Sequence, residues 1–216
     1  AGGYLIESRE VVIAPGAVVW LGLDKRRKRK SGRALLMGFA DESIPQVNAE
    51  IDALGKLIPE ADRFTGSSCS FAEYLRQAPR AAFIHLACHG DFRAEDPSYS
   101  SLHLAEGWVT AGDVARQKLN AELVTLSACD TGINKVAAGE EVLGMARGFL
   151  SAGVRNVILS HWAVTDAAAP RLMKDLYTEI QLGTSVAASL RKAQINAIRR
   201  GSNPYIWAPY FLIGAG

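Results

Sequence analysis

The chain has few cysteines, little net charge and no long apolar run. Its three cysteines, Cys69, Cys88 and Cys129, are an odd set without CxxC spacing. Such a set argues against a disulfide framework and favours a reducing compartment, so we expect a cytoplasmic protein. The formal net charge of +2 is too small to produce a whole-molecule field toward nucleic acid or a membrane surface. The longest apolar stretch, residues 11–23, is broken at Pro15-Gly16 and is shorter than the roughly 20 residues of a membrane-spanning helix.

The chain does have enough apolar residues for one substantial core. Its 216 residues are 49% hydrophobic, which suits a single domain near the upper end of the usual size. Because residue 1 is Ala, we expect a C-terminal fragment of a longer protein. The composition suggests two parts, an N-terminal arm with a basic loop over residues 1–33 and a core over residues 34–216.

Two features mark the N-terminal arm. The apolar runs 11–13 and 17–21 flank a Pro-Gly turn signal, which predicts a small β-hairpin at an edge of the structure. Residues 25–30 are six consecutive Lys and Arg residues with no apolar face to bury. We therefore predict an exposed loop there, and we expect it to make no direct contact with nucleic acid.

From residue 34 onward, short apolar runs alternate with segments of helical spacing. This alternation is typical of an α/β fold around a mainly parallel sheet. The predicted strands are 35–39, 81–86, 123–126, 154–159 and, at the end, 204–213; the predicted helices are 46–57, 71–77, 140–152, 167–182 and 184–200.

Two polar segments directly follow predicted strands, 88–91 after the strand near Leu86 and 129–132 after the strand 123–126. In parallel sheets, functional groups gather beyond the carboxyl ends of the strands, so both segments are expected at the same rim. A thiol and an imidazole placed there can cleave an amide, with Cys129 as nucleophile and His89 as acid and base. The alternative is that Cys129 is a small buried hydrophobe and His89 a common strand-end histidine.

The same segments carry a family resemblance. Residues 84–90, IHLACHG, and 123–132, LVTLSACDTG, resemble the two signature motifs of the CHAT domain, a relative of caspases, metacaspases and separase. The likeness continues through 139–153, 160–166 and 207–214, with an echo of an upstream proline motif at 13–16. Where the family usually has an apolar residue, this chain has His161.

The resemblance implies a caspase-like three-layer α/β/α sandwich. It also implies that Cys129 and His89 form a catalytic dyad, that the backbone N–H groups of Gly90 and Cys129 hold the oxyanion, and that no metal or organic cofactor is required. A protein or peptide would be the substrate. A fused repeat region of tetratricopeptide type, or an activator protein, would regulate the activity. The alternative is a catalytically silent interaction or scaffold domain that keeps the fold.

Three residues are candidates for substrate binding. In separase-like and metacaspase-like relatives an acidic residue selects a basic P1 side chain, and Asp166 and Asp130 are placed to supply one here. Asp166 could instead cap the following helix, and Asp130 could serve a tight turn. Trp162 could line the cleft or pack as a rim aromatic. An acidic pocket would also make the basic run 25–30 a possible self-cleavage site.

A zinc site built from His85, Cys88, His89 and Cys129 is disfavoured. Along an extended strand, His85 and His89 would be about 13 Å apart, and Cys88 would face away from His89. We expect His85 to be a core-facing strand residue.

Overall fold

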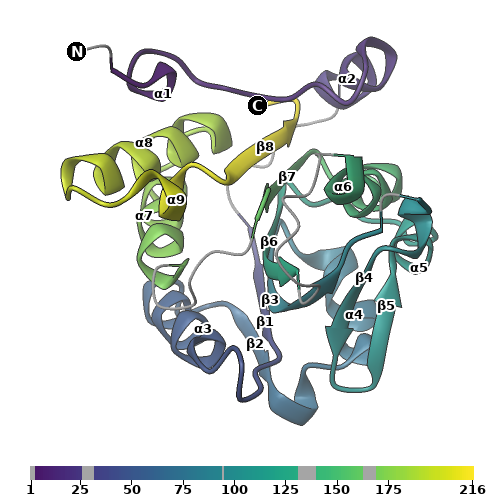
Figure 1. The fold of residues 1–216 in the computed structure, drawn as a ribbon. Coiled ribbons are helices and arrows are strands. Elements are labelled where there is room, and N and C mark those ends of the chain that lie inside the picture. The colour runs from purple at the N-terminus through teal and green to yellow at the C-terminus, as the bar shows by residue number, and fades with distance from the viewer. Residues whose placement is uncertain (1–2, 26–31, 94, 131–139, 163–168) are drawn as a thin grey trace.

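The centre of the molecule is a twisted, mainly parallel sheet (Figure 1). The structure is a computed structural model that describes residues 3–25, 32–93, 95–130, 140–162 and 169–216, with the backbone alone described at 128–130 and 140–142. In spatial order the strands are β2 (Asp62–Thr65), β1 (Ala34–Gly38), β3 (Phe83–Asp91), β6 (Leu123–Asp130), β7 (Asn156–Ser160) and β8 (Tyr210–Gly214). Neighbours in this order are parallel except for the antiparallel β7–β8 pair.

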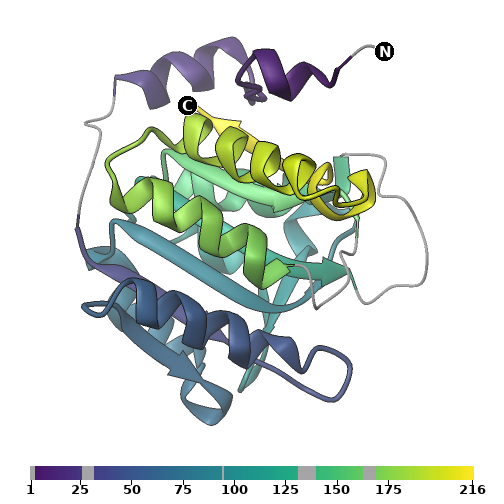
Figure 2. The same ribbon diagram turned by 90° about the vertical axis from the view of Figure 1, so that its left-hand side faces the viewer.

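Helices cover both faces of this sheet, which confirms the predicted three-layer α/β/α arrangement (Figures 1 and 2). One face packs against α3 (Gln46–Leu57), α7 (Ala169–Gln181) and α8 (Val186–Arg199). The other packs against α4 (Phe71–Gln77), α5 (Ala111–Ala115) and α6 (Glu140–Ala152). The remaining described elements are α9 (Pro204–Trp207), the hairpin of β4 (Ser101–Leu104) and β5 (Gly107–Thr110), and the 3-10 turns η1 (Gly66–Ser68), η2 (Ala78–Arg80) and η3 (Pro97–Tyr99).

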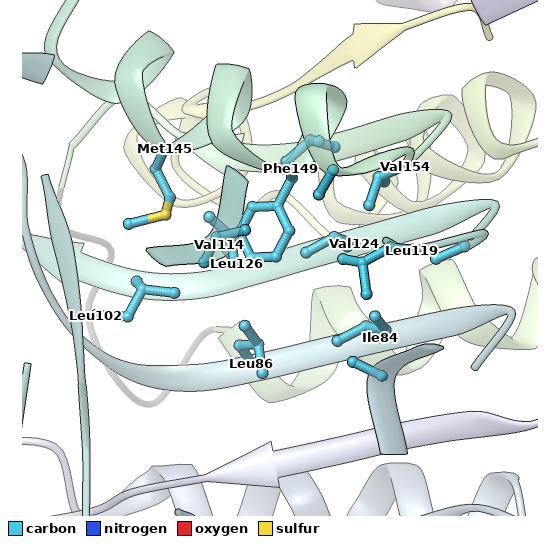
Figure 3. Packing of buried hydrophobic residues seen from close by; sticks show 14 of the residues in the cluster. Ile84, Leu86, Leu102, Val114, Leu119, Val124, Leu126, Met145, Phe149 and Val154 are labelled. Atoms are coloured by element: carbon cyan, nitrogen blue, oxygen red, sulfur yellow. The ribbon is translucent and has the colours of Figure 1, made fainter. Parts of the chain in front are cut away.

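Alternation along the central strands builds two separate cores. In β3, Ile84 and Leu86 face the α6 side, where they pack in the same cluster as Val124 and Leu126 of β6 (Figure 3). Phe149 of α6 enters this cluster and is fully buried. On the opposite face, the intervening positions of β3 and β6 meet α3, α7 and α8. Both faces of the strands are thus buried, which explains why their sequences are nearly continuous apolar runs.

The predicted N-terminal hairpin is wrong. The arm instead forms α1 (Leu5–Ser8) and α2 (Ala17–Asp24), joined by an extended segment that crosses the top of the molecule (Figure 1). A contiguous apolar run cannot by itself distinguish a strand from a helix. Here the segment is a helix whose end is capped by the buried Arg155 side chain, which donates to the Leu23 and Asp24 carbonyl oxygens at 2.5 and 3.3 Å. Those carbonyls lie in the last turn of α2, where the Leu23 carbonyl also accepts from the Lys25 N–H.

One residue of the arm nevertheless pairs with the sheet. Ile13 forms an isolated parallel bridge with Ile213 on the outer side of β8. Its N–H donates to the Leu212 carbonyl at 2.8 Å, and its own carbonyl accepts from the Gly214 N–H at 3.1 Å. Of the predicted basic loop, Lys25 ends α2 and the rest lies outside the described residues.

The final predicted strand, 204–213, is only partly correct. Its first half is the short helix α9, which begins with Pro204 and is capped by Asn203, whose side-chain oxygen accepts from the Tyr205 N–H at 2.9 Å. The strand proper, β8, begins at Tyr210. No helix within the described ranges combines the length and the apolarity needed to cross a bilayer.

Candidate active site

The two predicted catalytic residues occupy paired positions in neighbouring strands. Strands β3 and β6 run parallel, and their register places His89 opposite Cys129. Adjacent strands in a sheet are about 4.8 Å apart, so the two backbones are in immediate proximity at the carboxyl ends of both strands. The side chain of Cys129 lies outside the described part of the chain. The pairing arises because 83–91 and 123–130 are both long extended runs in one sheet.

The His89 ring is held by the loop that follows β1. Its Nε2 lies 2.7 Å from Asp41 Oδ2 and 3.2 Å from the Ser43 hydroxyl oxygen. The Asp41 carboxylate is itself held by Ser43, which donates its hydroxyl at 2.7 Å and its backbone N–H at 2.8 Å to Oδ1. The histidine is largely buried, whereas the Asp41 side chain is 48% exposed. The loop therefore fixes one edge of the imidazole against a carboxylate that reaches solvent.

The ionisation of Asp41 decides the tautomer of His89. The pKa of Asp41 is lowered to about 2, chiefly by the hydrogen bond from the Ser43 hydroxyl, with further lowering from the Ser43 N–H and from His89. At neutral pH Asp41 is a carboxylate and can only accept hydrogen bonds, so Nε2 carries the proton. In the neutral ring, Nδ1 is then the basic nitrogen. Among the described residues Nδ1 is buried and has no hydrogen-bond partner.

Replacing Ser43 by alanine tests this account of Asp41. We expect the pKa of Asp41 to rise from about 2 toward its ordinary value of 3.8, because the largest stabilising contact of the carboxylate is lost. In the native chain the lowered pKa stabilises the fold above about pH 4, and this contribution disappears as the pH falls toward 2. NMR titration of the Asp41 carboxyl carbon measures the shift. An unchanged midpoint in the Ser43→Ala variant would contradict the assignment.

The structure describes the other predicted site residues to different extents. Gly90 is buried in β3, between Asp130 of β6 and Leu102 of β4 in the strand register. The Asp130 backbone ends β6, but its side chain is not among those described, and Asp166 lies wholly outside the described residues. The roles of Gly90, Asp130 and Asp166 stay predictions.

Trp162 lies just beyond the carboxyl end of β7, as expected for a residue near the rim. Its indole N–H donates to the Tyr205 carbonyl of α9 at 3.0 Å, and the two rings are 5.5 Å apart. The adjacent His161 stacks on Phe211 with ring centroids 3.9 Å apart, and burial lowers the pKa of His161. His161 therefore packs as a structural aromatic against β8 despite its departure from the family pattern.

No cluster that could hold a metal ion occurs in the described ranges. His85 is fully buried, which confirms its prediction as a core-facing residue. Cys88 packs into the core on the α6 side, whereas His89 faces the loop that carries Asp41. The alternation of the strand thus separates Cys88 from His89, as the sequence predicts.

Sequence reasoning missed Asp41 and Ser43. Both lie a few residues after β1, and β1 is the parallel neighbour of β3. The strand-end rule that selected His89 and Cys129 applies equally to this loop, because its strand ends at the same rim. Finding Asp41 and Ser43 requires the order of the strands in the sheet, and the sequence does not give that order.

Comparison with known proteins fits this geometry. The family model described as the CHAT domain matches residues 1–215. The chain belongs to the CHAT domain family. CHAT domains are part of the caspase-like cysteine peptidase superfamily, so the predicted resemblance and fold are confirmed.

Similar proteins are much longer than this CHAT domain. Tetratricopeptide repeat protein 28 is 32% identical over 114 residues in Homo sapiens and 31% identical over 114 residues in Mus musculus. Each match covers 52% of this chain and only 5% of the length of the relative. Among solved structures, a chain of the separase–securin complex of Saccharomyces cerevisiae is similar, with a TM-score of 0.65 and 13% identity. The alignment covers 95% of this chain and 14% of the chain in that complex. At that identity the likeness shows the fold alone.

Proposed function

We propose that this CHAT domain is a cysteine endopeptidase in which Cys129 and His89 form the catalytic dyad. The observation that carries the proposal is the strand register that sets His89 opposite Cys129, with the imidazole held by Asp41 at 2.7 Å. A histidine fixed in one tautomer beside a cysteine position is the arrangement that thiol hydrolysis requires.

The reaction proceeds in two stages. The Cys129 thiolate attacks the carbonyl carbon of the scissile amide, and the oxyanion that forms accepts hydrogen bonds from the N–H groups of Gly90 and Cys129. The C–N bond then breaks, and His89 gives a proton to the departing amine, leaving a thioester. His89 next takes a proton from water, whose oxygen attacks the thioester carbonyl. The C–S bond breaks, the acid product leaves and the thiolate is restored.

Asp41 contributes by orienting the ring. Its carboxylate accepts the Nε2 proton and leaves Nδ1 to exchange a proton with the substrate or with water. The positive charge that the ring gains during the cycle lies next to the negative charge of Asp41.

Substrate choice and regulation are further parts of the proposal. Asp166 and Asp130 would favour a basic P1 side chain, and Trp162 would line the cleft. The similarity to tetratricopeptide repeat protein 28 supports a regulatory partner of the helical-repeat kind. The two buried thiols of Cys69 and Cys88 support action in the reducing cytoplasm.

A thiol-reactive peptide ketone with a basic P1 residue tests the function. We expect stoichiometric modification of Cys129, read by peptide mass spectrometry, and none of Cys69, because burial raises the pKa of that thiol to about 12. The His89→Ala variant should react far more slowly. A chain that reacts only at Cys69, or not at all, would contradict the peptidase and favour a silent scaffold domain.

Asp41→Asn should lower the turnover number of peptide cleavage by about tenfold to a hundredfold, with little change in KM. An amide can present its N–H to the ring, so the tautomer and ring orientation that Asp41 imposes would be lost. Steady-state kinetics of both enzymes measures the change. The exposed Asp52 on α3 supplies a matched control, since Asp52→Asn leaves the rim untouched. Equal turnover in the Asp41 and Asp52 variants would remove Asp41 from the site.

A further inference from the structure

A column of polar residues lies below the dyad, on the face of the sheet that packs against α3 and α7. The strand register defines its rows: His85 is opposite Thr125, Ala87 is opposite Ser127, and His89 is opposite Cys129. Below the first row the same face is apolar, with Phe83 opposite Leu123. Polar residues thus begin within the core and continue up to the row that holds the dyad, without a break along β6 and with Ala87 between His85 and His89 along β3.

Glu50 of α3 joins the lower two rows. Its Oε1 lies 2.8 Å from His85 Nε2, and its Oε2 accepts the Ser127 hydroxyl at 3.2 Å. Glu50 is 3% exposed and His85 is fully buried, so their contact is made away from water, whereas Ser127 is half-buried. One carboxylate therefore ties the strand that carries His89 to the strand that carries Cys129. It does so two positions, about 7 Å, before the nucleophile.

Tyr177 of α7 meets the column at its lowest row. Its hydroxyl donates to the Thr125 hydroxyl at 3.1 Å, and its ring packs edge-on against His85 at 5.5 Å. Burial raises the pKa of Tyr177, so the hydroxyl stays protonated and acts as the donor. This contact is farther from the dyad than that of Ser127, which makes Tyr177 a natural control.

A buried carboxylate is an unusual way to stabilise this core. Ion pairs and hydrogen-bonded carboxylates in protein interiors lose solvation, and well-packed apolar residues in their place are often equally stable or more so. The surrounding residues of α3 and of the sheet are apolar and fully buried, including Ile51, Leu54 and Leu36. What Glu50 adds is a directional link between two particular strand ends.

We propose that Glu50 is a positioning residue for the dyad: the backbone ladder sets the spacing of β3 and β6, and Glu50, through His85 and Ser127, steadies the ends of the two strands on the face where the His89 and Cys129 positions lie. The proposal rests on the peptidase function above. It predicts that loss of the Glu50 link loosens the ends of the two paired strands, so that the imidazole and the thiol meet less often and the thiolate population of Cys129 falls, because a neighbouring histidine favours the thiolate.

The test uses iodoacetamide at neutral pH, with the rate of Cys129 modification followed by mass spectrometry. We expect Glu50→Gln and Ser127→Ala each to slow the reaction by about tenfold. Ser127→Thr, which keeps the hydroxyl, should react within about twofold of the native rate, and so should Tyr177→Phe, which removes one buried hydroxyl from the lowest row. In a His89→Ala background, Glu50→Gln should cause no further loss, since the two residues act on one thiol.

The outcomes separate the possible roles of Glu50. Faster labelling of Glu50→Gln would show that the carboxylate acts through its negative charge, and equal slowing by Tyr177→Phe would show a general loss of packing. Either result overturns the proposal, as does additivity with His89→Ala. If Glu50→Gln does not fold, the comparison of Ser127→Ala with Ser127→Thr decides. Failure of the peptidase proposal is separate: the peptide ketone would then leave Cys129 unmodified while iodoacetamide still reports its reactivity.

Discussion

Peptide cleavage is expected to fall by more than about a thousandfold when either Cys129 or His89 is replaced by alanine. Without Cys129 no thioester can form. Without His89 neither the leaving amine nor the attacking water has a proton partner. The double variant should cleave no more slowly than either single variant, because the two residues act as one unit. Steady-state cleavage of a peptide library, with the products identified by mass spectrometry, gives all three rates.

Cys69→Ala is the matched control for this prediction. It makes the same substitution at a thiol that is fully buried in the α6-side core, and cleavage should stay close to that of the native chain. Circular dichroism and thermal unfolding should show that the Cys129 and His89 variants remain folded. Cleavage at the native rate by either variant would show that the dyad is wrongly assigned.

Replacing the buried Arg155 by methionine should lower the free energy of unfolding by about 3–5 kcal/mol. Arg155 is 2% exposed and sits at the amino end of β7. It lies 3.5 Å from Glu122 and 3.4 Å from Asp24, and it donates to the Leu23 carbonyl. Its loss leaves the Glu122 carboxylate without its cation and the end of α2 without its cap. Urea unfolding measures the change.

Arg147→Met on the exposed side of α6 is the comparison, and it should change stability by less than about 0.5 kcal/mol. Hydrogen exchange adds a local test. The amides of α2 should lose protection in the Arg155 variant well before those of β3 and β6. Protection of α2 equal to that in the native chain would mean that Arg155 does not anchor the arm.

Elements with a clear period or a buried strand run could be predicted from the sequence. The helix expected at 46–57 is α3 with the same limits, because its apolar positions recur on one face. The arm could not be predicted, since residues 17–23 are apolar on every side and carry no period. The end of its helix is capped by Arg155, which is more than a hundred residues away in the sequence, and no local pattern reports that contact.

The candidate site divides in the same way. His89 and Cys129 could be found because each follows its own strand and belongs to a motif. Asp41 and Glu50 lie on the loop and helix after β1, and their roles depend on β1 and α3 packing beside β3. A carboxylate near the end of a strand is common in sequences, and only the order of strands shows which imidazole it faces.

The bridge between Ile13 and β8 has a practical consequence for shorter versions of this protein. A fragment beginning at Ala34 would keep every strand of the sheet but would leave the Leu212 carbonyl and the Gly214 amide without the partners that Ile13 provides. Exposed edges of this kind recruit strands from other molecules. Such a fragment should therefore self-associate through β8 at concentrations where the 216-residue chain stays dispersed.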